Sequence, residues 1–113
     1  MLVTAIILFI LAALLGLLIV KAIFKNKSTP KRVVLMHGSF AGIALLLVII
    51  YVITGHTSPL IITSLVLFIV AALGGLTMLT IDLSKKPIPK SFAIFHPLIA
   101  IIALTTLIIY LLG

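Results

Sequence analysis

The sequence predicts an all-α polytopic membrane protein, a bundle of four transmembrane helices made of two tandem helical hairpins. Three observations support this fold class. The 113 residues are 65% hydrophobic and only 8% charged, a balance far from that of soluble globular domains. The apolar residues form four runs, each long enough to cross a bilayer with about 20 residues. The chain also repeats itself, with two apolar runs in each repeat.

The four runs are separated by helix-breaking residues. In chain order, the predicted spans cover residues 2–24, 33–54, 60–83 and 92–112. Pro30 lies in the first connection, residues 55–59 form the second, and Pro87 and Pro89 lie in the third. Because these connections are so short, neighbouring spans must be antiparallel, and we expect a single transmembrane domain over residues 1–113.

Basic residues gather in the first and third connections and are missing from the second. They are Lys21, Lys25, Lys27, Lys31 and Arg32 in one cluster and Lys85, Lys86 and Lys90 in the other. A net charge of +7 would suggest nucleic acid in a soluble protein, but beside apolar spans it indicates topology signals near anionic lipid headgroups. We therefore expect the lipid bilayer and no nucleic acid as partner. The positive-inside rule places both termini on the non-cytoplasmic side of a prokaryotic-type cytoplasmic (inner) membrane. The first span lacks a basic leader and a cleavage site, so we expect it to be retained.

The internal repeat has a period of 59 residues. Aligning residues 1–54 with residues 60–113 needs no gap and gives 20 identical positions. The matches include less common residues, such as Phe9 with Phe68 and Tyr51 with Tyr110. Since each unit holds two spans, both copies enter the membrane in the same direction, and we expect a pseudo-two-fold axis along the membrane normal.

Two histidines, His37 and His96, stand out as ionisable residues within the spans, where polar groups are costly and are candidates for function. They are repeat counterparts, and each lies six residues after a lysine, about 9 Å along a helix. Facing each other at equal depth, two neutral imidazoles could hold the iron of one haem b between them. The sequence thus predicts His37 and His96 as iron ligands.

Other repeated residues fit such a cofactor. Small residues on the same helix face, Ala41 and Ala100, leave room for a flat ligand, as do Gly16 and Gly75 on the odd-numbered spans, although close helix packing explains them equally well. Three cations near the histidines could pair with haem propionates: Lys31, Arg32 and Lys90. Gly38 and Pro97 follow the histidines and could help to aim the rings.

The segments KRVVLMHGSFAG and KSFAIFHPLIAI resemble the histidine-bearing helices of membrane-embedded b-type cytochromes. In that family, histidines on four-helix bundles clamp haem and are often followed by Gly or Pro. The resemblance implies a cytochrome that carries electrons near the cytoplasmic side and exchanges them with a quinone or another redox protein. Many members stack two haems on four histidines, whereas this chain offers one intramembrane pair. Any oxidoreductase activity is implied by the resemblance alone.

Several alternatives stay open. The histidines could instead be structural, bonded to each other, to Ser39 or Thr77 or to backbone carbonyls, in a small membrane subunit or interaction protein. A metal ion would find only two ligands unless a homodimer added more. Transport of small molecules or ions is disfavoured, because the first span has no acidic residue.

Two further residues have no assigned function. We expect His56 to be a solvated loop residue and Asp82, the single acid, to pair with Lys85 or Lys86 one turn along the chain.

Overall fold

A computed structural model describes all residues, 1–113, and consists of four helices without a strand. The helices are α1 (Leu2–Phe24), α2 (Lys31–Ile53), α3 (Pro59–Leu83) and α4 (Lys90–Leu112). Each is long and apolar enough to cross a membrane, which confirms the predicted fold class. Helices α2 and α4 begin two residues earlier than predicted, directly after the N-cap residues Pro30 and Pro89, because the predicted spans started at the first apolar residue while the preceding polar residues are also helical.

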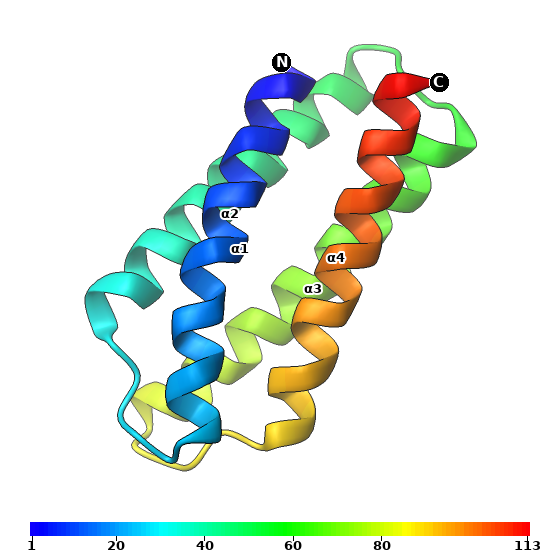
Figure 1. Ribbon diagram of the computed structural model, residues 1–113. Helices are drawn as coiled ribbons and strands as arrows, with labels where there is room; N and C mark the ends of the chain where they lie inside the picture. Colours follow the sequence, from blue (N-terminus) through cyan, green and yellow to red (C-terminus); the bar gives the residue numbers. More distant parts are fainter.

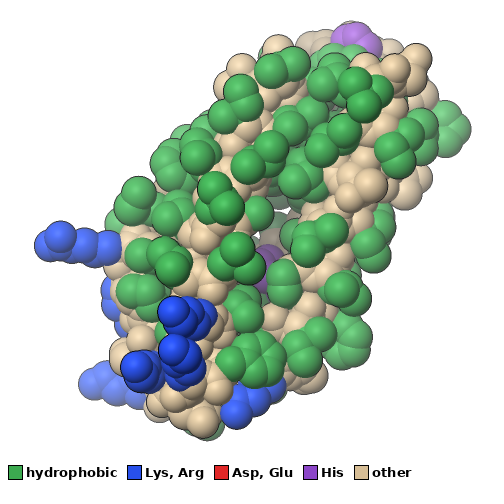
Figure 2. All heavy atoms as spheres, viewed as in Figure 1, with side chains coloured by type: hydrophobic (Ala, Val, Ile, Leu, Met, Phe, Trp, Pro, Cys, Tyr) green, Lys and Arg blue, Asp and Glu red, His purple; other side chains and the backbone are tan.

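The helices form two antiparallel hairpins that lie side by side (Figure 1). Helix α1 packs mainly against α2, and α3 against α4, while α1 also meets α4 and α2 meets α3. The diagonal pairs are therefore α1 with α3 and α2 with α4. Both termini lie at one end of the bundle with the 54–58 connection, here called the terminal end (Figure 1). The 25–30 and 84–89 connections lie at the other end, called the basic end because the lysines gather there (Figure 2).

Apolar side chains cover most of the face of the bundle seen in Figure 2, and all four helices carry exposed large apolar residues. Only 16 of 113 residues are buried within the chain, and large side chains such as Leu17, Leu35 and Leu73 are at least 60% exposed. The bundle is 43 Å long, close to the roughly 40–45 Å of a bilayer with its headgroups. A lipid bilayer is the environment that such a surface fits.

The interior is built from repeat counterparts that meet across the diagonals. The Phe9 and Phe68 rings stack with their centroids 3.9 Å apart and their planes parallel within 1°. Toward the terminal end, the hydroxyls of Tyr51 and Tyr110 are 3.0 Å apart and share a hydrogen bond. These pairs lie where a pseudo-two-fold axis between the hairpins would run.

The two connections at the basic end are also built alike. Asn26 and Lys85 both adopt left-handed backbone angles, with φ of 54° and 59°, and are repeat counterparts. The next amide in each loop donates back into the helix, Lys27 to Ala22 and Lys86 to Ile81, which is a Schellman end. Both odd-numbered helices therefore end in the same way.

Asp82 does not bind the lysines expected from sequence. Its carboxylate accepts a hydrogen bond from the Thr29 hydroxyl at 2.6 Å and pairs with the Lys31 ammonium at 2.6 Å. The prediction of a partner at Lys85 or Lys86 was wrong, because the chain leaves α3 in the Schellman turn just after Asp82. The bond instead joins the end of α3 to the connection before α2.

Candidate functional site

His37 and His96 face each other across the α2–α4 diagonal. Their ring centroids lie 6.1 Å apart, and the ring planes cross at 76°. Both residues are only partly exposed, and histidine atoms are visible through a gap between the front helices in Figure 2. The structure thus brings together the two residues that the sequence singled out.

Each imidazole is tied to the neighbouring helix of its own hairpin. The Nδ1 atom of His37 lies 2.7 Å from the carbonyl oxygen of Ala12, and that of His96 lies 2.8 Å from the carbonyl oxygen of Ala71. A carbonyl oxygen only accepts hydrogen bonds, so Nδ1 carries the proton in both rings. In the neutral imidazole, the lone pair is then on Nε2.

Neither Nε2 atom makes a hydrogen bond within the chain, and neither is sealed from its surroundings. A histidine that binds a metal commonly donates its other N–H to a backbone carbonyl, which fixes the tautomer and the ring direction. Both histidines have this arrangement already.

Gly16 and Gly75 make room for the rings. A Cβ atom at Gly16 would lie 3.2 Å from His37 Cε1, and one at Gly75 would lie 3.1 Å from His96 Cε1. Both distances are shorter than ordinary van der Waals contact, so any larger side chain would displace the imidazole. The repeat pattern favours helix packing or ligand space at these glycines, and the structure places each of them against a histidine ring.

The Phe9–Phe68 stack lies next to the histidine pair along the bundle axis. Phe9 precedes Ala12 by three residues, as Phe68 precedes Ala71, so the stack lies about 4.5 Å toward the terminal end. The identity of these phenylalanines in the two repeats is the sequence signal for the stack, although it predicts no role for them.

The remaining predicted site residues are spread around the pair. Ala41 and Ala100 are partly buried on the faces of α2 and α4 that carry the histidines. Gly38 is exposed, and a Cβ atom there would meet nothing within 4 Å. A side chain at this position would therefore not reach His96.

Of the three predicted cations, one is already engaged. Lys31 binds Asp82 and donates to Thr29 at 2.8 Å. Arg32 and Lys90 are exposed and have no ion pair within the chain.

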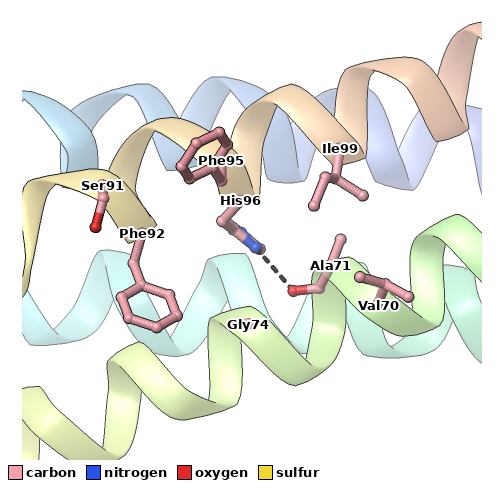
Figure 3. Close-up of a pocket in the computed structure, with 8 residues that line it drawn as sticks. All are labelled: Val70, Ala71, Gly74, Ser91, Phe92, Phe95, His96 and Ile99. Atoms are coloured by element: carbon pink, nitrogen blue, oxygen red, sulfur yellow. Dashed lines mark hydrogen bonds between the residues drawn. The ribbon is translucent and has the colours of Figure 1, made fainter.

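A cavity of about 240 Å³ opens between α3 and α4 beside His96. Its walls are mostly apolar, with Phe92, Phe95 and Ile99 on α4 and Val70 on α3, and His96 reaches across it toward the Ala71 carbonyl (Figure 3). Gly74 leaves this space open, and its repeat counterpart is Leu15.

His56 lies at the terminal end, away from the histidine pair. It is exposed, stacks on Tyr51 with ring centroids 3.8 Å apart, and its Nδ1 lies 2.9 Å from the Tyr51 carbonyl. No group of three or more His, Cys, Asp or Glu comes together in the chain. The candidate donor set inside the bundle is therefore two imidazoles.

Fold and site together define a four-helix membrane protein with one pair of facing intramembrane histidines. Comparison of the chain with protein-family models, with curated proteins and with solved structures finds no significant match.

Proposed function

We propose that this protein is a membrane cytochrome that binds one haem b through His37 and His96 and carries electrons. The observation that carries the proposal is the shared tautomer of the pair. Each Nδ1–H is held by a carbonyl, so each ring offers the Nε2 lone pair that iron requires. The ring centroids lie 6.1 Å apart, so the two imidazoles would hold the iron between them once the hairpins separate enough to admit the macrocycle.

The chain's residues would hold and tune this cofactor. The Ala12 and Ala71 carbonyls fix the ring directions and make the imidazoles better donors. Haem iron supplies one-electron chemistry, with a potential set by its axial ligands and by burial. Arg32 and Lys90, which lack ion pairs, are free to bind propionates, and Lys31 can do so by leaving Asp82.

Haem binding would require the two hairpins to move apart. A cavity of about 240 Å³ beside His96 is smaller than the roughly 300–1,000 Å³ of pockets for larger ligands. The contacts between hairpins, α1 with α4 and α2 with α3, are less extensive than those within them. The interface that must open is therefore the weaker one, and the Nδ1 bonds, which lie within each hairpin, can persist.

The redox setting follows from the expected orientation. With the basic end on the cytoplasmic side of an inner membrane, the histidine pair lies nearer that side and would exchange electrons with a quinone or another redox protein there. A homodimer would place two such centres in one assembly.

Structural histidines are the second candidate. They are favoured by the same hydrogen bonds, since each Nδ1–H ties two helices together. A centroid distance of 6.1 Å also suits an edge-to-face contact of two aromatic rings. In this case the protein would be a small membrane subunit or interaction protein without a cofactor.

An absorption spectrum separates the two candidates. Protein expressed in cells supplied with haem and purified in detergent should be coloured and, after dithionite, show the sharp α band of low-spin haem with two histidine ligands. Colourless protein that also fails to bind added hemin would overturn the cytochrome proposal in favour of structural histidines.

Variants assign the ligands. His37→Ala and His96→Ala should each abolish the low-spin spectrum, whereas the control His56→Ala should leave it unchanged, because His56 lies at the terminal end. Equal effects of all three substitutions would refute the assignment.

A further inference from the structure

A second hollow lies at the basic end, between the two connections, and has a volume of about 600 Å³. Its walls come from both repeats: residues 26–29 on one side and residues 85–88 on the other. These two stretches are repeat counterparts, offset by 59 residues. The hollow therefore lies between equivalent loops, at the basic end of the pseudo-two-fold axis.

The charge of this hollow is strongly positive. Lys27, Lys85 and Lys86 line it, and none of them has an acidic partner within the chain. Its single acid, Asp82, is neutralised by Lys31 at 2.6 Å. Three lysines without an acidic partner thus line one space, which suits a phosphate group.

The hollow also has an apolar side. Ile23 at the end of α1, Leu83 at the end of α3 and Ile88 in the following connection line it. A ligand that satisfies both sides has a phosphate head and a hydrocarbon body. This chemistry points to a phospholipid more than to free phosphate.

We propose that the hollow binds the headgroup of an anionic phospholipid, with Lys27 and Lys86, one from each repeat, holding its phosphate. The lipid's acyl chains follow the apolar side into the bilayer. Basic pockets at this position in membrane proteins are suited to such headgroups. The proposal does not depend on haem, because Lys27 and Lys86 are not among the cations expected to bind its propionates.

Native mass spectrometry of the detergent-purified full chain provides the test, with dioleoyl phosphatidylglycerol as probe and dioleoyl phosphatidylcholine as the neutral comparison. The wild type should retain phosphatidylglycerol selectively. The double variant K27Q/K86Q should weaken its binding about tenfold or more, since each lysine near an anionic lipid contributes about a factor of five. The variant K27R/K86R should bind normally.

The matched control is K21Q/K25Q, which removes the same two charges from residues that do not line the hollow. It should change binding by less than about threefold. Asp82→Asn frees Lys31 and should strengthen binding, which keeps the proposal testable even if K27Q/K86Q fails to fold. Equal losses in both double variants, equal retention of phosphatidylcholine, or full displacement of the lipid by an equal concentration of inorganic phosphate would each overturn the proposal.

Discussion

At the scale of single residues, each histidine is fixed at two points by the other helix of its own hairpin. A backbone carbonyl holds Nδ1, and a glycine one turn further along leaves space for Cε1. From the opposite hairpin, the other histidine lies edge-on to the ring, with the centroids 6.1 Å apart. Each hairpin therefore positions its own histidine, and packing of the two hairpins brings the two rings together.

This arrangement predicts a specific effect of Gly75→Ala. Alanine stabilises a helix by about 1 kcal/mol relative to glycine when its methyl group meets nothing. At Gly75 the methyl group would meet His96 Cε1 at 3.1 Å, so the imidazole must shift and strain its bond to Ala71. We expect the thermal unfolding midpoint of the detergent-purified variant to fall below that of the Gly74→Ala control. Where haem is bound, its α band should weaken.

Gly74→Ala is the matched control, because a Cβ atom there meets nothing within 4 Å. It should leave the midpoint unchanged or raise it. Equal midpoints for the two variants would show that Gly75 does not confine the ring. Gly16→Ala, with its methyl group 3.2 Å from His37 Cε1, should repeat the effect in the first copy.

At the scale of helices, polar side chains near both ends of the bundle form bonds between elements that are not neighbours in the sequence. Asp82 ties α3 to the connection before α2, and the tyrosine hydroxyls tie α2 to α4. The repeat alignment could indicate the tyrosine pair, since both copies have Tyr at that position. The alignment could not indicate the partner of Asp82, because the counterpart of Asp82 is Ile23. The i+3 and i+4 spacing could not indicate it either, because that spacing finds partners on the same helix only.

Asp82→Asn tests the first connection. Loss of the carboxylate charge weakens the bonds from Thr29 and Lys31, and because Lys31 is 55% exposed, we expect a loss of about 1 kcal/mol or less in unfolding free energy. The measurement is the thermal midpoint in detergent at low and high salt, with a smaller loss at high salt. Thr80→Ala is the control, since its hydroxyl bonds only to Leu76 of the same helix; an equal loss there would contradict the role of Asp82.

A double-mutant cycle tests the second connection. Tyr51→Phe and Tyr110→Phe each remove one hydroxyl of a 3.0 Å pair, and interhelical hydrogen bonds in membrane proteins contribute about 0.6 kcal/mol. The loss of stability in the double variant should therefore be smaller than the sum of the two single losses. The difference, which is the coupling energy, should be about 0.6 kcal/mol. Strictly additive losses would mean that the hydroxyls do not interact.

At the scale of the whole molecule, composition and repetition were sufficient to predict the fold. Four apolar runs with short breaks determine a four-helix membrane bundle, and the helix bounds differ by at most two residues from those expected. The histidine pair was also predictable, because identical residues in tandem copies must occupy equivalent places. The Ala12 and Ala71 carbonyls were predictable only as one alternative among several, because backbone acceptors leave no trace in the side-chain pattern.

The orientation of the whole bundle in the membrane is the last prediction. Eight Lys and Arg residues lie at or near the basic end, and the terminal end has none, so we expect from the positive-inside rule that the basic end lies in the cytoplasm. A C-terminal alkaline phosphatase fusion should therefore be active and a C-terminal green fluorescent protein fusion dark, because phosphatase folds outside the cytoplasm and the fluorescent protein within it. Replacing the basic residues of both connections by glutamine should reduce this bias and produce a mixed population. A fluorescent C-terminal fusion of the wild type would instead place the termini in the cytoplasm, and the proposed haem would then lie nearer the opposite side of the membrane.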